Sequence, residues 1–286
     1  MLIAQITDVH LGFDPTTPDE FNRQRLDAAL AVLVAMTPRP DLLLVTGDIA
    51  DQGDDRQSYR RFREAIAEVP FPVYGAMGNH DDRAAYRDAF PDTPAPDGFI
   101  QYAIEDHSLR ILVLDTLAEG RHGGGYCERR AAWLRARLDE QPERPTLIAL
   151  HHPPVATGLS WLDENPDAEW MERLRDVVDG RDNVVGLIAG HLHRPIVTSW
   201  AGAMLIVCPS TAPQVALDLA AVDPAQPDER ALIVADDPCF ALHLWDGRNL
   251  VSHFDAAADH EVLARYTPEL QPLVQLLQAE RNGGAD

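Results

Sequence analysis

The stretch that decides the fold is Asp41-Leu42-Leu43-Leu44-Val45-Thr46-Gly47-Asp48-Ile49-Ala50-Asp51. Its run of Leu and Val predicts a strand that is buried on both faces. Gly47 ends that strand, and Asp48 stands at its carboxyl tip, where ligands gather in open α/β sheets. A carboxylate there is costly unless a positive group meets it. Gly-Asp after a strand is most often an ordinary turn, so its interpretation depends on the rest of the chain.

Four other polar clusters also follow apolar runs. They are Asp8-Val9-His10, Gly78-Asn79-His80-Asp81, His151-His152-Pro153 and Gly190-His191-Leu192-His193. Two of them hold donors two residues apart, a spacing that puts both side chains on one face of an extended segment. With Asp48, the clusters supply seven oxygen and nitrogen donors at strand ends: Asp8, His10, Asp48, Asn79, His151, His191 and His193.

This donor set indicates a metal centre. Imidazole combined with carboxylate suits Zn, Fe or Mn better than Ca or Mg. Seven donors are too many for one tetrahedral ion, and they suit two ions that share a bridging carboxylate. A single His at a strand end is more often a hydrogen-bonded structural residue, and Asn79 alone has an alternative role as a helix cap. The joint pattern favours a dinuclear site.

Other histidines do not join this pattern. His107, His122, His243, His253 and His260 have no partner at ligand spacing and are interpreted as structural. The run His122-Gly123-Gly124-Gly125 resembles the oxyanion-hole segment of esterases, but that fold also needs a Gly-x-Ser-x-Gly elbow, which the sequence lacks. Residues 118–125 are therefore predicted to form a glycine-rich turn before a helix.

The order of elements predicts an α/β fold, because strands and helices alternate as far as residue 189, apart from two consecutive strands at 99–104 and 111–115. Strands are expected at 2–7, 42–45, 73–77, 99–104, 111–115, 146–150 and 184–189, and helices at 21–36, 55–68, 83–89, 126–140 and 167–179. Beyond Pro195 short strands follow one another without helices, and Asp246-Gly247 predicts a hairpin turn. We expect one domain over 1–256, with a β-rich region at 195–255, and a C-terminal helical tail over 257–286.

Charge limits the partners. The 286 residues carry a net charge of −22, and all 24 basic residues are Arg. With no basic surface, the chain is not expected to bind nucleic acid polymers or anionic membranes. It shows neither a basic leader nor a long apolar run, so we predict no signal peptide or membrane span and a cytoplasmic protein.

The ordered motifs resemble those of a known family. Asp8-x-His10, Gly47-Asp48, Gly78-Asn79-His80-Asp81, His151-x-Pro153 and Gly190-His191-x-His193, in that order, are similar to the calcineurin-like metallophosphoesterases. The resemblance extends from residue 1 to about 210. Within the family, it is strongest to class III cyclic nucleotide phosphodiesterases and bacterial glycerophosphodiesterases. It implies a four-layer α/β/β/α sandwich, in which two mixed sheets are flanked by helices, followed by the β-rich hairpin region.

The resemblance also implies the role of each donor. Asp8, His10, Asp48 and His193 would hold one divalent ion, and Asp48, Asn79, His151 and His191 the other, so that Asp48 bridges two ions of Mn, Fe or Zn. A hydroxide between the ions would attack phosphorus. His80 is expected to be catalytic without being a ligand, acting beside Asp48 and Asn79. His152 is expected to support the ligands from behind.

The implied reaction is hydrolysis of a small phosphodiester, such as 3′,5′-cyclic AMP or a glycerophosphodiester. His80, Asn79, Phe13 and Trp161 are the candidate substrate contacts, although the two aromatic residues have an alternative role as loop packing. A phosphomonoesterase of the same fold is the nearest alternative. A nuclease and a metal-free binding scaffold are less favoured, because the chain is acidic and its donor set is complete.

A homodimer is a further expectation. The region 195–255 carries Trp200, Phe240, Trp245 and Phe254 and is expected to lie outside the layered core. The resemblance implies that this region serves association. The alternative is a hairpin packed on its own chain.

Overall fold

The computed structural model describes residues 1–14, 16–17 and 19–283. Five strands form the first sheet, in the order β13-β12-β1-β2-β3. They span Leu2–Ile6 (β1), Leu42–Val45 (β2), Val73–Gly75 (β3), Cys239–Trp245 (β12) and Leu250–Ala256 (β13). The β1, β2 and β3 strands run parallel, whereas β12 pairs antiparallel with both β1 and β13. The quoted stretch is therefore a central strand, which accounts for its unbroken apolar run.

Six strands form the second sheet, in the order β4-β5-β6-β7-β9-β8. They span Tyr102–Ile104 (β4), Arg110–Val113 (β5), Thr146–Ala149 (β6), Val184–Ala189 (β7), Ile196–Trp200 (β8) and Ala203–Val207 (β9). Parallel pairing runs from β5 through β6 and β7 to β9, and antiparallel strands close both edges. A small separate sheet pairs β10 (Gln214–Val215) with β11 (Ile233–Val234).

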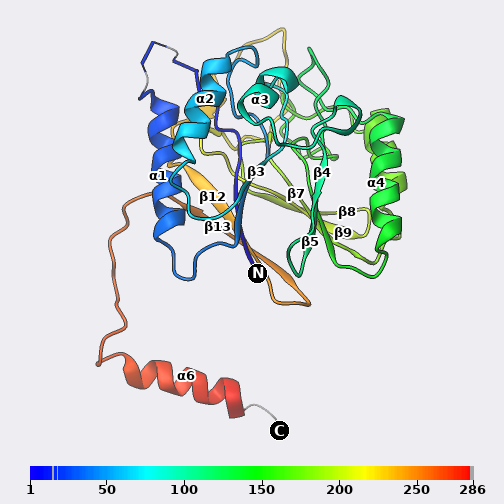
Figure 1. Cartoon of the computed structure of the whole chain (residues 1–286). Coiled ribbons are helices and arrows are strands. Elements are labelled where there is room, and N and C mark those ends of the chain that lie inside the picture. Colours follow the sequence, from blue (N-terminus) through cyan, green and yellow to red (C-terminus); the bar gives the residue numbers. More distant parts are fainter. Residues whose placement is uncertain (15, 18, 284–286) are drawn as a thin grey trace.

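Helices cover the outer faces of both sheets. The helices α1 (Phe21–Ala35) and α2 (Arg56–Ala65) lie beside the first sheet, and α4 (Glu128–Glu140) lies on the far side of the second (Figure 1). Two more helices, α3 (Arg83–Ala89) and α5 (Glu169–Val178), and a short 3-10 turn at Pro96–Gly98 complete the body. The predicted four-layer sandwich of two mixed sheets and flanking helices is confirmed.

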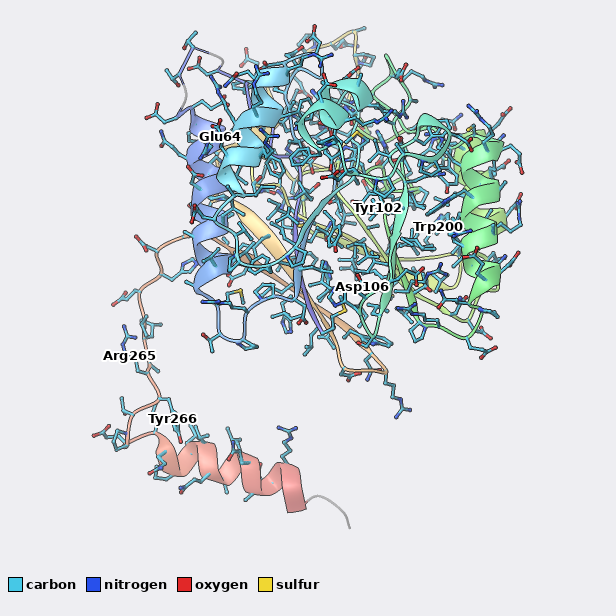
Figure 2. All side chains as sticks on the ribbon, viewed as in Figure 1. Glu64, Tyr102, Asp106, Trp200, Arg265 and Tyr266 are labelled. Carbon is cyan, nitrogen blue, oxygen red and sulfur yellow. The ribbon has the colours of Figure 1, made fainter. Side chains whose placement is uncertain are left out.

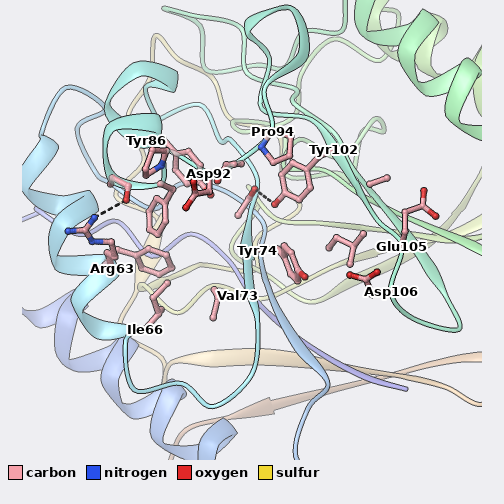
Figure 3. Close-up of a pocket in the computed structure, with 18 residues that line it drawn as sticks. Arg63, Ile66, Val73, Tyr74, Tyr86, Asp92, Pro94, Tyr102, Glu105 and Asp106 are labelled. Atoms are coloured by element: carbon pink, nitrogen blue, oxygen red, sulfur yellow. Dashed lines mark hydrogen bonds between the residues drawn. The ribbon is translucent and has the colours of Figure 1, made fainter.

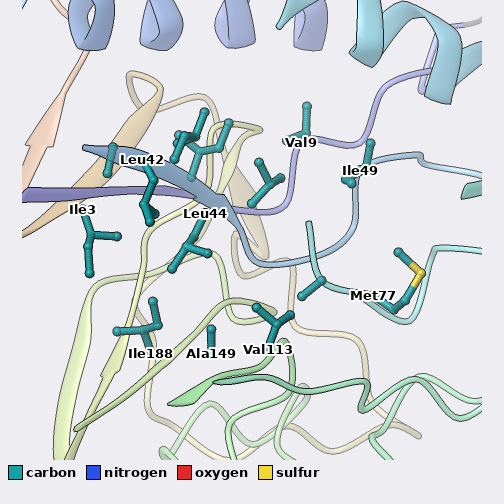
Figure 4. Packing of buried hydrophobic residues seen from close by; sticks show 14 of the residues in the cluster. Ile3, Val9, Leu42, Leu44, Ile49, Met77, Val113, Ala149 and Ile188 are labelled. Carbon is teal, nitrogen blue, oxygen red and sulfur yellow. The ribbon is translucent and has the colours of Figure 1, made fainter. Parts of the chain in front are cut away.

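The principal core lies between the two sheets. Ile3, Leu42 and Leu44 of the first sheet face Val113, Ala149 and Ile188 of the second (Figure 4). All six are buried, and each fully buried Leu or Ile contributes about 2 kcal/mol of transfer free energy. A second apolar cluster joins the other face of the second sheet to α4 and α5. Two cores on either side of one sheet hold the strand ends rigidly.

The region 195–255 does not lie outside the layered core, so that prediction was wrong. β8 and β9 belong to the second sheet, and β12 and β13 to the first. Trp200, Phe240 and Trp245 are buried within the chain, and only Phe254 is substantially exposed. The predicted hairpin turn at Asp246-Gly247 is confirmed, since it joins β12 to β13 and Gly247 has a φ of 96°.

The C-terminal tail begins after β13 and leads away from the body. Arg265 and Tyr266 lie on this extended segment, well clear of the sheets (Figure 2). The helix α6 (Gln271–Gly283) starts 14 residues after residue 257, where the predicted helical tail begins. The last three residues of the predicted tail, 284–286, fall outside the described part of the chain. Over the described residues, no helix combines the length and apolar character needed to cross a membrane.

Candidate metal centre

The predicted donors follow the carboxyl ends of parallel strands in both sheets. Asp8 and His10 follow β1, Asp48 follows β2, and Asn79 follows β3 in the first sheet. In the second sheet, His151 follows β6, and His191 and His193 follow β7. Because the two sheets face each other, these strand ends meet at one edge of the sandwich.

The structure brings the donor atoms of six of these residues into contact. The His151 Nε2 atom lies 3.3 Å from Asp48 Oδ2 and 3.2 Å from Asn79 Oδ1. The His193 Nε2 atom lies 3.4 Å from Asp8 Oδ1 and 3.2 Å from His10 Nε2. The seventh residue, His191, joins them through its ring, whose centroid lies 5.1 Å from that of His151.

The donors form overlapping groups that fit metal ions. Asp8, His10 and His193 make one group, and Asp8, Asp48 and His151 make another; within each, one atom per residue lies within 4.8 Å of the others. Asp48 also belongs to a group with His10 and His80, and His151 to one with His152 and His191. Asp48 sits between these groups, and mixed imidazole and carboxylate donors suit Zn, Fe or Mn.

The backbone at the site is strained. Asp8, His10, Asp48, His191 and His193 all have positive φ, between 49° and 74°. Non-glycine residues rarely adopt this conformation, and it persists only where the surrounding structure enforces it. These five are all predicted ligands, so the strain coincides with the site.

The turn after β3 approaches Asp48 so closely that residue 78 has to be a glycine. A Cβ atom added to Gly78 would collide with the carboxylate and the backbone nitrogen of Asp48. The Asp48 carboxylate accepts a hydrogen bond of 2.8 Å from the His80 backbone nitrogen in the same turn. The turn after β3 therefore packs directly on the carboxylate that follows β2.

Hydrogen bonds orient three of the histidines from behind. The Nδ1 atoms of His151 and His193 donate to the carbonyl oxygens of Thr46 (2.7 Å) and Pro213 (2.8 Å). The Nδ1 atom of His10 lies 3.3 Å from the Asp51 carboxylate. Each contact directs the opposite ring nitrogen, Nε2, into the cluster and fixes the tautomer that a metal ligand needs.

The donor residues of the cluster differ in the direction of their pKa shifts. Burial penalises the ionised carboxylate of Asp48, but the charges on His151 and His10 outweigh it and hold the pKa of Asp48 well below its usual range. Burial likewise opposes charge on His151, yet Asp48 and Asp8 raise the pKa of His151 to about 9. Burial and neighbouring imidazoles lower the pKa of His191 well below its usual value. The site therefore holds the anionic carboxylate of Asp48 paired with a charged His151, beside a neutral nitrogen donor on His191.

Of the predicted substrate contacts outside the ligand set, His80 is the one seen in contact with the cluster. His80 is half-buried; its Nδ1 donates to the Asp51 carbonyl oxygen (2.8 Å), and its ring meets that of His10 edge-on at 4.6 Å between centroids. Phe13 is 71% exposed, three residues after His10. Trp161 is partly exposed in the loop that follows His151. Asn79 does not cap α3, because that role belongs to the Asp82 side chain, which accepts from the Ala85 nitrogen.

The position of His122 differs from its prediction, and the structure adds a contact for His152. His122, predicted to be structural and without a partner, has its Nδ1 atom 3.1 Å from Asn79 Nδ2, and its ring lies 4.7 Å from that of His191. His152 is buried behind the site, as predicted, with its Nδ1 atom 2.8 Å from the Thr116 hydroxyl. The sequence signal at His122 was its glycine run, which brings the loop close to the site.

The structure also contains a cavity away from the donor cluster. It has a volume of about 670 Å³ and lies between α2, α3 and β4, where Tyr74, Tyr86 and Tyr102 line it (Figure 3). None of the predicted donors or substrate contacts lines this cavity. The chemistry of the molecule is therefore concentrated at the strand ends and not in this cavity.

Comparison with known proteins gives the family. The family model of the calcineurin-like phosphoesterases matches residues 1–195. The chain is 31% identical over 260 residues to the probable glycerophosphodiester phosphodiesterase GpdQ of Arcobacter nitrofigilis, covering 88% of this chain and 92% of that protein. It is 35% identical over 218 residues to the 3′,5′-cyclic adenosine monophosphate phosphodiesterase CpdA of Escherichia coli K12, covering 74% and 76%.

Solved structures agree on the fold. A dimetal phosphatase from Danio rerio superposes with a TM-score of 0.62 at 18% identity, covering 91% of this chain and 97% of that one. Purple acid phosphatase PPD1 from yellow lupin gives 0.60 at 15% identity, covering 92% and 52%. With its sandwich, its strand-end cluster of His and Asp side chains, and a family match over most of its length, this chain belongs to the calcineurin-like phosphoesterases, a family of metal-dependent hydrolases.

Proposed function

We propose that this protein hydrolyses small phosphodiesters with two divalent metal ions. The observation that carries the proposal is the convergence of carboxylate, amide and imidazole donors around Asp48. Relatives that cover most of the chain bear the names of glycerophosphodiester and cyclic nucleotide phosphodiesterases, which supports a diester substrate.

The proposed ligands divide into two sets. Asp8, His10, Asp48 and His193 hold one ion, and Asp48, Asn79, His151 and His191 hold the other. The group of Asp8, His10 and His193 supports the first set, and the proximity of His151 and His191 supports the second. Asp48 bridges the sets because its carboxylate lies 3.3 Å from His151 and 3.8 Å from His10. The donor types restrict the candidate metals to Mn, Fe and Zn. Elemental analysis tests which of them is bound.

When bound, two such ions activate a water molecule and neutralise the phosphoryl oxygens. Water supplies the new oxygen on phosphorus, the ester P–O bond breaks, and the leaving oxygen takes up a proton. His80 is the proposed donor of that proton. Its Nδ1–H is committed to the Asp51 carbonyl oxygen, so the proton that is transferred is the second one, on Nε2 of the doubly protonated ring. The water that attacks phosphorus releases one proton, which balances the one that Nε2 gives up. Asp48 and Asn79 would hold the ions beside the reacting phosphoryl group.

The decisive experiment is a substrate panel with the Mn-loaded enzyme. It compares kcat/KM for bis(p-nitrophenyl) phosphate, p-nitrophenyl phosphate, cyclic AMP and glycerophosphoethanolamine. We expect at least one diester to exceed the monoester. A monoester preferred tenfold over every diester would replace the proposal with a phosphomonoesterase. Binding of duplex DNA that weakens with salt would instead indicate a nuclease.

The quaternary state, the tail and the location are separate proposals. We propose a homodimer formed through the edge strand β13, because Val251 and Phe254 on that strand are exposed apolar residues. Sedimentation as a monomer at micromolar concentration would contradict it.

We also propose that residues 1–256 form the catalytic unit and that the tail is dispensable for hydrolysis, which deletion of residues 257–286 tests. The cytoplasmic location stays a prediction, and cell fractionation tests it.

A further inference from the structure

The glycine run at 123–125 holds a loop tightly against the metal centre. The Gly124 nitrogen donates to Glu164 Oε2 (2.9 Å), and the Gly125 nitrogen donates to the Thr116 carbonyl oxygen (2.9 Å). A Cβ atom added to Gly124 would lie 2.8 Å from the Trp170 ring and 3.0 Å from the His152 Cβ. A residue with a side chain at Gly124 would push the loop outward, so the loop is built for this close approach.

The close approach gives His122 a defined tautomer. Asn79 directs its Oδ1 atom toward His151 and its Nδ2 atom toward His122. An amide nitrogen is only a donor, so the Nδ1 atom of His122 accepts. The hydrogen of the neutral ring is then on Nε2. His122 is exposed, and this N–H is a donor within reach of a substrate held at the site.

A small cavity opens beside His122. It has a volume of about 390 Å³, and its lining consists of Arg121, His122, Gly123, Trp161, Leu162, Asp163 and Glu164. Both carboxylates in the lining are already occupied. Asp163 accepts from the backbone and hydroxyl of Thr157, and Glu164 accepts from the Trp170 indole nitrogen. The lining therefore offers an indole face, an imidazole N–H and the Arg121 guanidinium.

His80 and His122 contact different members of the donor cluster. The His80 ring packs on His10, in the first proposed ligand set, whereas the His122 ring packs on His191, in the second. With His80 assigned to the leaving ester oxygen, His122 is the histidine left for the other ester group of a diester.

We propose that the cavity between His122 and Trp161 receives the retained substituent of the diester, and that it selects planar aromatic or heterocyclic groups over small aliphatic ones. The His122 Nε2–H donates to the retained ester oxygen, and the substituent stacks on the Trp161 indole. This inference rests on the proposed function and narrows it to diesters with a nucleoside-like retained group. A flat ring gains from stacking on an indole, whereas a methyl or glycerol group does not.

The test holds the leaving group constant. Bis(p-nitrophenyl) phosphate and methyl p-nitrophenyl phosphate both release p-nitrophenolate, so they differ only in the retained substituent. We expect Trp161→Ala to lower kcat/KM for the aryl diester roughly tenfold while the methyl diester changes little. Trp133→Ala is the matched control, because Trp133 is also partly exposed but lies on α4. An aryl-to-methyl ratio that Trp161→Ala leaves unchanged, or an equal loss on both substrates, would overturn the proposal.

A binding measurement separates the cavity from catalysis. Phenylphosphonate and methylphosphonate cannot be hydrolysed, and their binding constants report the same preference by calorimetry. Wild type should favour the phenyl compound, and Trp161→Ala should remove that preference. If wild type hydrolyses no diester but keeps the preference, the proposed function fails and the cavity assignment stands. If wild type hydrolyses diesters without the preference, the cavity assignment fails.

His122 is tested with a variant that keeps its contact with Asn79. In His122→Asn, the new Oδ1 atom replaces Nδ1 as acceptor, but the distal N–H is lost. We expect kcat/KM on both diesters to fall roughly fivefold, the scale of one hydrogen bond, with metal content unchanged. Wild-type activity in His122→Asn would show that His122 only positions Asn79 and would overturn its contact with substrate.

Discussion

Acid should destabilise this protein through one buried histidine that is not among the proposed metal ligands. His243 lies on β12 with no exposed surface. Its Nε2 atom lies 2.9 Å from Gln5 Oε1, and its Nδ1 atom lies 2.7 Å from the Ser252 hydroxyl. The Gln5 amide nitrogen donates to Thr46 and to the carbonyl oxygen of Ala189 in the other sheet, so the Gln5 oxygen is left to accept from His243. This network holds a neutral ring, and burial lowers the pKa of His243 to about 4.

The size and sign of the effect follow from proton linkage. Below pH 6.5 the unfolded chain binds a proton on His243 that the folded chain does not bind. The free energy of unfolding therefore falls as the pH drops from 6.5 toward 4, and it levels off below. A separation of about 2.5 pH units corresponds to about 3 kcal/mol in full, of which about 2 kcal/mol is lost between pH 7 and 5.

Urea unfolding of wild type and His243→Gln at pH 7, 6 and 5 measures this loss. This range stays above the sequence pI of about 4.7. Glutamine is neutral throughout, so we expect the stability difference between the two proteins to shrink by about 2 kcal/mol from pH 7 to 5. His253→Gln is the control, because His253 is exposed on the adjacent strand β13, opposite Leu242. Parallel stability curves for wild type and His243→Gln would refute the reasoning.

Three other predictions test the site and the core. Asp48→Asn should lower the occupancy of both ions by elemental analysis, whereas His10→Ala should chiefly affect one; a metal-replete wild type with one ion or fewer would contradict the dinuclear proposal. His80→Ala should reduce turnover roughly 10²-fold or more with both ions retained, and loss of metal along with activity would show that its role is wrong. Leu43→Ala should lower the free energy of unfolding by about 2–5 kcal/mol in urea titrations, because Leu43 is fully buried. Leu263→Ala, at a residue 87% exposed, is its control, and equal effects would contradict the core assignment.

The local parts of the fold and site could be predicted from the sequence. Each donor directly follows an apolar run, and the apolar run alone fixes where the strand ends. Positions such as Asp48 and His151 therefore follow from short patterns, because parallel strands in a sandwich deliver their carboxyl ends to one edge. The helix boundaries also agree to within a few residues, except in the tail.

Contacts between distant segments could not be predicted in this way. His122 meets Asn79 across 43 residues, and that contact depends on the path of a glycine-rich loop against Glu164, which no spacing rule encodes. The placement of residues 195–255 failed for the same reason. The strand β12 pairs with β1, which lies near the other end of the chain. The alternating pattern of β12 predicts that one face of the strand is buried, but it does not identify the strand with which β12 pairs.

That pairing of β1 with β12 sets an order on biosynthesis. The Met1 amine donates to the Trp245 carbonyl oxygen, 244 residues further along, and Leu2 lies opposite Leu244. Until β12 has left the ribosome, β1 has a neighbour on one side only, and its other edge presents unpaired backbone groups. Asp8 and His10 follow directly from β1, so the metal centre gains its final support late in translation. A shortened chain that ended at residue 195 would contain the whole family motif but lack the strand that completes the first sheet.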